Sequence, residues 1–209
     1  MKIVPVAIAV LAIGLGAAFW ALKTNDGITP AQKTLAIEYK NRGIEFLENS
    51  KLAEAEQQFE QLVAIAPKER LGWQNLAITR QLMVLKRNPD VEKFREEIAK
   101  TEEALSALMT NFPSEMESHY LAGRLYNELR EIPTAEQQAI DAFKKAADLA
   151  PDDPQAWYAI FEAGRYSSDA KIKQQALDAL GSAAKLAHDN FHITIERLVA
   201  QASAKDPSL

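Results

Sequence analysis

Apolar side chains recur at helical spacing along most of the chain, and prolines separate the runs. Residues three or four apart lie on one face of an α-helix, so each run predicts an amphipathic helix. Four runs end at Pro67, Pro113, Pro151 and His188. The apolar positions that share a face in these runs are Ala55, Phe59 and Leu62; Leu105 and Leu108; Ala139, Phe143 and Ala146; and Ala176, Leu180 and Ala183. The pattern predicts an all-α chain.

Two of these runs are copies of one another. Residues 139–153 return as residues 176–190 at an offset of 37, and eight of the fifteen positions are identical. A period of this size is typical of helical repeat arrays, in which each unit buries its apolar face against its neighbours. Such arrays bind other molecules more often than they catalyse reactions.

A different pattern opens the chain. Residues 3–22 carry no charge and lie between Lys2 and Lys23. Twenty helical residues span about 30 Å, the thickness of the hydrocarbon core of a bilayer. We therefore expect residues 1–23 to be a transmembrane anchor. The alternative is a cleaved signal peptide with Gly16 and Ala18 at the cleavage site, although the apolar run is long for one.

The charges around this segment bear on its orientation. The short basic start favours a body outside the cytoplasm, which predicts a single-pass protein of the bacterial inner membrane with a periplasmic domain. The positive residues that follow the segment argue in the opposite direction. They are Lys23, Lys33, Lys40 and Arg42.

Helix-start signals divide the remainder of the chain. Residues 24–29 are expected to form a linker, residues 30–204 the helical repeat domain, and residues 205–209 a flexible tail. Thr29-Pro30 and Asp153-Pro154 each combine an N-cap residue with proline at the first helical position. Two further pairs have the spacing of a capping box. They are Ser114 with Glu117, and Thr134 with Gln137.

Composition narrows the functional classes. The chain has 209 residues, of which 47 % are hydrophobic and 25 % charged, and its net charge is −5. An acidic chain without a basic block gains little from phosphates, so we expect no nucleic-acid partner. The chain has no cysteine, which excludes thiol catalysis, disulfides and a cysteine-linked lipid anchor.

The spaced positions resemble the tetratricopeptide repeat (TPR), a 34-residue helix pair with characteristic aromatic, Gly, Ala and Pro positions. The resemblance covers about 155 of the 209 residues in four units. The first unit matches at Tyr39, Gly43, Phe46, Ala55, Phe59 and Pro67. The opening motifs of the other units are Trp73, Leu76 and Ala77; His119, Ala122, Gly123 and Tyr126; and Trp157 and Ile160. The resemblance implies a right-handed α-solenoid with a C-terminal capping helix.

The departures from the repeat also predict structure. Units two, three and four exceed the repeat length by twelve, four and three residues between their two helices. Because a helical turn takes 3.6 residues, such insertions lengthen a helix by whole turns. We expect the longest helix at about residues 90–110. In unit four, Phe161 stands where the repeat has glycine.

The resemblance further implies a concave groove lined by the first helix of each unit, which binds a protein or peptide. Its candidate residues in units one and two are Lys40, Asn41, Ile44, Gln74, Asn75, Ile78 and Gln81. Those in units three and four are Tyr120, Arg124, Asn127, Tyr158, Glu162 and Arg165. Amides can bind a peptide backbone, and Tyr and Arg are frequent anchors at interfaces. A purely solvated surface is the alternative. Ile44 replaces the Asn of the family's chaperone-tail clamp, so we do not expect chaperone-tail binding.

No catalytic motif or cofactor-binding motif stands out, and we expect neither an enzyme nor a cofactor. His188, His192 and Glu196 have the spacing of metal ligands on one helix. His188 takes the turn position of Pro151, however, so we expect no metal site.

The sequence thus predicts a membrane-tethered TPR scaffold that binds a protein partner and serves assembly of a membrane or envelope complex. The alternatives are a permanent structural subunit of a larger membrane complex and, remotely, a metal-dependent enzyme.

Overall fold

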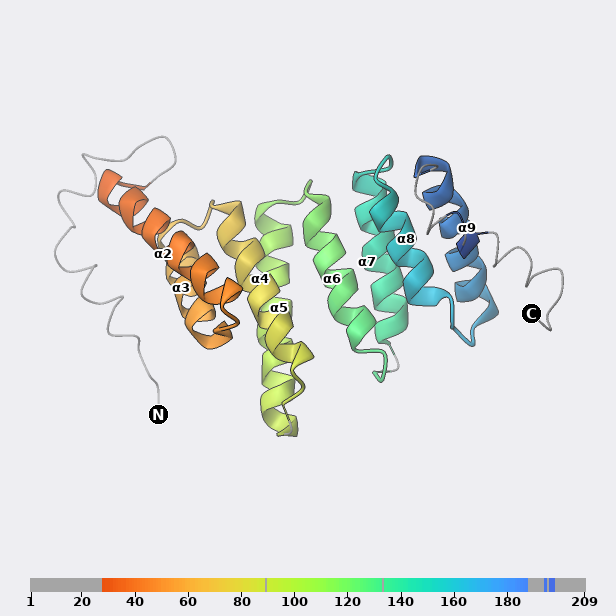
Figure 1. Cartoon of the computed structure of the whole chain (residues 1–209), viewed down its shortest axis with the longest axis horizontal. Coiled ribbons are helices and arrows are strands. Elements are labelled where there is room, and N and C mark those ends of the chain that lie inside the picture. The colour runs from red at the N-terminus through yellow and green to blue at the C-terminus, as the bar shows by residue number, and fades with distance from the viewer. Residues whose placement is uncertain (1–27, 89, 133, 188–193, 195, 198–209) are drawn as a thin grey trace. The chain divides into compact units, whose positions relative to one another are not determined.

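The computed structural model describes residues 28–88, 90–132, 134–187, 194, 196 and 197 (Figure 1). This part of the chain contains eight α-helices and no strand. In chain order they are α2 (Pro30–Glu48), α3 (Leu52–Ile65), α4 (Arg70–Leu85), α5 (Val91–Asn111), α6 (Met116–Glu128), α7 (Ala135–Leu149), α8 (Pro154–Gly164) and α9 (Ala170–Leu186). The all-α prediction is confirmed.

The chain divides into two compact units, residues up to Thr79 and residues from Arg80 onward. In the first unit, α2 packs against α3. In the second unit, α5 packs on α6, α6 on α7, α7 on α8 and α8 on α9. Consecutive helix pairs are the arrangement that the repeat pattern predicts.

In the first unit, α2 and α3 pack closely where a glycine faces an aromatic ring. Phe59 of α3 is fully buried, as is Ala55 one turn before it. The backbone of Gly43 on α2 lies so close to Phe59 that a Cβ atom there would be 2.5 Å from the ring atom Cε1. The Gly43–Phe59 pair therefore sets the close approach of α2 and α3.

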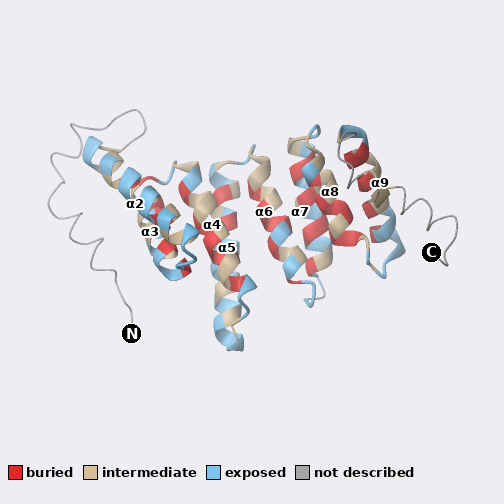
Figure 2. Ribbon diagram, viewed as in Figure 1, coloured by how far each residue is buried: buried red, intermediate tan, exposed pale blue. Residues whose placement is uncertain are grey.

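The second unit also has a core of buried apolar residues. Figure 2 shows buried residues along α7 and α8. One core cluster combines Phe143 and Ile140 of α7 with Ile160 of α8. A neighbouring cluster combines Phe161 of α8 with Leu180 of α9.

Two helix starts have the predicted caps. Thr29 and Gln32 form a reciprocal capping box at α2, and Pro30 takes the first helical position. Asp153 accepts a hydrogen bond from the backbone N–H of Gln155 at α8, where Pro154 comes first in the helix.

The two predicted capping boxes are wrong. The N-cap of α6 is Glu115 rather than Ser114, and its side chain caps no backbone N–H. Thr134 is the N-cap of α7, but its backbone has helical angles (φ −90°, ψ −14°). An N-cap side chain normally reaches the helix from an extended backbone, so the Thr134 hydroxyl makes no capping bond.

The insertions lengthen helices in two of three units. α5 has 21 residues and is the longest described helix, and its first turns extend past the end of α6 (Figure 1). α9 has 17 residues against 14 in α3. In unit three, α7 has only 15 residues and the insertion lies between the end of α6 and the start of α7. Pro133 disfavours a helical conformation at the residue before it, which explains why the helix does not extend backwards.

Several predictions fall on residues that the structure does not describe. The predicted anchor at 1–23, residues 24–27 of the predicted linker at 24–29, and the predicted tail at 205–209 lie outside the described residues. No helix in the described part has the length and apolarity needed to cross a bilayer.

Candidate functional site

The predicted groove residues of the first unit lie on α2 and the first part of α4. Lys40, Ile44, Gln74, Asn75 and Ile78 are half-buried, while Asn41 is exposed. The Lys40 ammonium lies 3.8 Å from the carboxylate of Glu69 in the turn before α4. Arg70 donates a hydrogen bond to the Gln74 side-chain oxygen at 3.0 Å. These side chains are positioned by local contacts and remain accessible.

A groove of about 500 Å³ opens beside Lys40 in the same unit. One wall is the face of α2 that carries Lys33, Ala36, Ile37 and Lys40, with Ile28 before it. The other wall is the end of α3 and the turn that follows it, formed by Leu62, Ala66, Pro67, Lys68 and Glu69. The sequence prediction contained Lys40 but missed Lys33 and Lys68.

In the second unit, Gln81 corrects the prediction. Its side chain is only 3 % exposed, so it is not available to a partner as it stands. Arg80 and Thr79 beside it are also buried. Three consecutive buried positions cover more than half the circumference of a helix, so this part of α4 has no wide solvent-facing side.

A chain of polar contacts joins α6 to α8. Arg130 follows α6 and donates to the Asn127 side-chain oxygen at 2.7 Å and to the backbone carbonyl of Glu162 at 2.9 Å. Glu162 in turn accepts from Arg165 at 2.7 Å. Arg130 therefore connects two sets of predicted groove residues, Asn127 on α6 and Glu162 of α8 with Arg165, which directly follows α8.

Arg165, at the end of this row, contacts several neighbouring side chains. Its guanidinium lies 5.3 Å from the ring centroid of Phe161 and 4.6 Å from that of Tyr166. It also donates to Glu196 at 3.1 Å and to the Tyr166 hydroxyl at 2.6 Å. Tyr166 is 75 % exposed, which is unusual for a tyrosine. The sequence prediction missed Arg130, Tyr166 and this use of Glu196.

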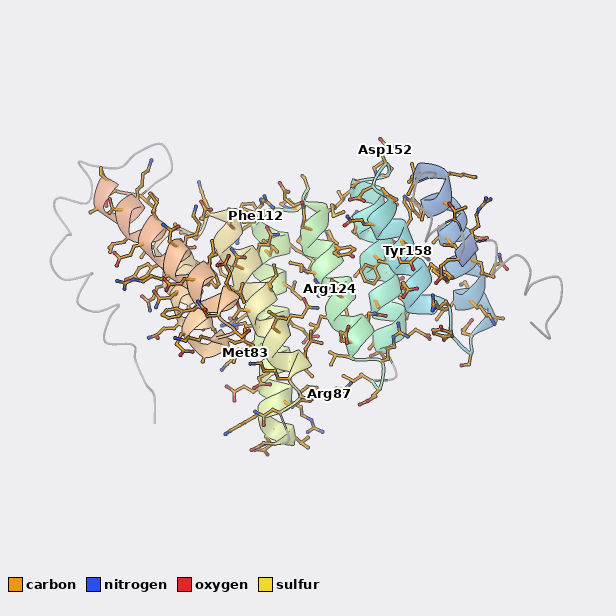
Figure 3. The ribbon with its side chains drawn as sticks, viewed as in Figure 1. Met83, Arg87, Phe112, Arg124, Asp152 and Tyr158 are labelled. Carbon is orange, nitrogen blue, oxygen red and sulfur yellow. The ribbon has the colours of Figure 1, made fainter. Side chains whose placement is uncertain are left out.

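Two predicted tyrosines pack beside the row. Tyr120 packs on Phe143 with ring centroids 5.4 Å apart, and Tyr158 packs on Phe161 at 5.9 Å. Burial, together with the Glu162 and Glu196 carboxylates, raises the pKa of Tyr158 to about 12. Tyr158 is therefore a neutral hydrogen-bonding group at physiological pH. Figure 3 shows the positions of Tyr158 on α8 and of Arg124, an exposed residue on α6.

The arrangement resembles known repeat proteins in fold. No family model matches the chain, and no curated protein matches it. Among solved structures, TTC0263, a thermophilic TPR protein of Thermus thermophilus, matches with a TM-score of 0.63 and 19 % identity, covering 94 % of this chain and 96 % of that one. The ArsTM double mutant of MamA RS-1 matches with a TM-score of 0.58 and 14 % identity, covering 75 % and 77 %.

The fold is TPR-like. At these identities the likeness concerns the fold alone, and the row of side chains on α6 and α8 has to be interpreted from its own chemistry. That row offers hydrogen-bond donors, acceptors and exposed aromatic surface. The described residues hold no cluster of three potential metal ligands, and His188 and His192 lie outside them.

Proposed function

We propose that this protein is a scaffold that binds a protein partner through the first helices of its repeat pairs. The observation that carries the proposal is the polar row from Asn127 to Arg165. Hydrogen bonds between neighbouring helix pairs hold its members in place while leaving them partly exposed. A preorganised row of this kind loses little conformational entropy on binding, which favours recognition.

The chemistry of the row suits a peptide or protein surface. Asn and Arg side chains can pair with backbone carbonyls, and the half-buried Tyr120 and Tyr158 supply apolar area with a polar end. Tyr and Arg are also the residues that most often dominate interface energies. No group in the row is arranged as a nucleophile with its base, so the geometry favours binding over catalysis.

We further propose that residues 1–23 tether this scaffold to the bacterial inner membrane, with the repeat domain on the periplasmic side. The support is the uncharged stretch at 3–22, which has the length of a membrane span. Tethering raises the effective concentration of the scaffold near membrane partners, so a moderate affinity suffices for assembly of a membrane or envelope complex.

Site-specific photo-crosslinking in native membranes tests the binding surface. A crosslinking residue at Arg124 is expected to give a discrete adduct with another protein, whereas one at Arg95, an exposed residue of α5, is expected to give none. Equal labelling at both positions would contradict binding through α6 and α8.

Fractionation and intact-mass measurement of the native protein test the tether, because cleavage near Ala18 would release a species that lacks the first eighteen residues.

A second candidate function is that of a permanent structural subunit. One observation favours it: Val91, Leu85 and Ile132 are 61 %, 37 % and 40 % exposed near the overhanging start of α5. Leu85 and Ile132 also line a small groove there. Exposed apolar side chains of this size often mark a covered surface. Size-exclusion chromatography separates the two candidates, because a permanent subunit alone is expected to aggregate and an adaptor to run as a monomer.

A further inference from the structure

The groove of the first unit has a composition that differs from the rest of the chain. Three lysines, Lys33, Lys40 and Lys68, and one carboxylate, Glu69, line it. Its formal charge is therefore +2, whereas the whole chain carries −5. Positive charge concentrated in a recess of an acidic protein indicates a negatively charged ligand.

Apolar residues form part of both walls of the groove. On the wall formed by the end of α3, Leu62 is fully buried and Ala66 is 5 % exposed. Ile37 stands on the α2 wall with 55 % of its surface exposed. A side chain of the size of leucine or phenylalanine can cover Ile37 and Pro67 within the space of about 500 Å³.

Two of the three lysines, Lys40 and Lys68, can reach a ligand at small cost. Lys40 and Glu69 lie 3.8 Å apart with 29 % and 37 % of their side chains exposed, so their attraction is weak. Lys40 can therefore exchange Glu69 for another carboxylate. Lys68 is exposed and has no ion pair with any residue in the part of the chain that the structure describes.

We propose that this groove binds an acidic segment of the partner protein. A bulky apolar side chain of the segment lies against Ile37 and Pro67, and the flanking carboxylates pair with Lys33, Lys40 and Lys68. The inference rests on the proposed scaffold function and names the chemistry of its partner at the first unit.

An anionic membrane surface is the competing ligand, and two observations disfavour it. Polybasic membrane-binding segments usually carry four to eight Lys or Arg residues, whereas this groove has three lysines and a carboxylate. Its apolar residues also belong to both walls of the groove, which suits one inserted side chain better than a flat layer of headgroups.

Peptide binding to the full chain in detergent tests the proposal. Two fluorescent pools of twelve-residue peptides serve as probes, one made from Asp, Glu, Leu and Phe and the other from Lys, Arg, Leu and Phe. The acidic pool is expected to bind at least tenfold more tightly, and its affinity is expected to fall as salt is added. Equal affinity for the two pools would overturn the proposal.

Matched variants locate the site. Lys68→Glu and Lys51→Glu make the same charge change at exposed positions, but Lys51 lies in the turn between α2 and α3 and does not line the groove. Lys68→Glu is expected to weaken acidic-pool binding about fivefold to tenfold, and Lys51→Glu less than twofold. Ile37→Ser is expected to weaken binding about tenfold with unchanged thermal stability, because Ile37 is already exposed. Equal losses with Lys68→Glu and Lys51→Glu would place the peptide elsewhere.

Other occupants give distinct results. Binding of anionic phospholipid vesicles that depends on Lys68, without a preference for acidic peptides, would overturn the proposal in favour of a membrane contact. A gain in peptide affinity on deleting residues 1–23 would show that the chain's own apolar segment fills the groove, and would also overturn it. Co-purification of a partner that persists in the Lys68→Glu variant would support the scaffold function and would contradict binding of an acidic segment in this groove.

Discussion

Phe143 of α7 lies directly on the backbone of Gly123 of α6. A Cβ atom built on Gly123 would be 2.5 Å from the Phe143 ring atom Cδ1. Gly43 and Phe59 have the same relationship in the first unit. Both pairs occupy equivalent positions in their repeats, so in these two repeats one glycine and one phenylalanine fix how closely the two helices approach.

This relationship predicts the effect of adding a single methyl group. Gly123→Ala forces the ring or the helices apart and is expected to lower the free energy of unfolding by about 1–3 kcal/mol. Gly181→Ala is the matched control, because a Cβ there meets no other atom within 4 Å. Alanine also favours the helix at Gly181, so that variant is expected to gain about 0.5–1 kcal/mol. Urea unfolding of both variants measures the difference, and a Gly123→Ala chain as stable as the wild type would contradict the packing.

Unit four shows how far the repeat pattern can be followed from sequence. Phe161 replaces the glycine, and Leu180 on α9 stands where Phe143 stands on α7. Phe161 is 4 % exposed and packs in one cluster with Leu180 and Ala176. The large side chain has thus moved from the second helix to the first. Periodicity alone could predict this helix pair because the apolar positions are kept even though their sizes are exchanged.

A second prediction concerns Arg165 and Glu196, whose side chains are 3.1 Å apart and both 24 % exposed. A double-mutant cycle with Arg165→Gln and Glu196→Gln is expected to give a coupling energy of about 0.5–1 kcal/mol. Arg87 and Glu131 form the control pair at 3.0 Å, with 58 % and 80 % exposure. Their coupling is expected to be smaller because water screens it. A larger coupling for Arg87–Glu131 would show that Glu196 does not hold Arg165.

The pH dependence of stability supplies a third prediction. Burial, and then the charge of Lys145, lower the pKa of His119 below its usual 6.5. His119 therefore binds a proton more readily in the unfolded chain than in the folded chain. This residue lowers the stability of the fold as the pH falls below about 6.5. His119→Gln is expected to reduce the loss of stability between pH 7 and pH 5, measured by thermal unfolding at both values. An identical loss in the variant and the wild type would rule out this role for His119.

The candidate site was less predictable than the fold. The helix face that carries Lys40, Arg124 and Tyr158 follows from repeat spacing. The burial of Gln81 and the Arg165–Glu196 pair do not, because they depend on packing and on contacts between residues distant in sequence. Lys33 lies on α2 but before the matched positions of the first repeat, and Lys68 lies in a turn. A pattern restricted to matched positions of first helices could therefore include neither of them.

Co-purification of the full chain from native membranes in mild detergent tests the proposed binding function most directly. A partner protein is expected at a constant ratio to the wild-type chain. It is expected to be lost with Arg124→Glu, an exposed position on α6, and retained with Arg95→Glu, an exposed position on α5. Absence of any partner at a constant ratio, or equal retention by both variants, would contradict a scaffold that binds through these helices.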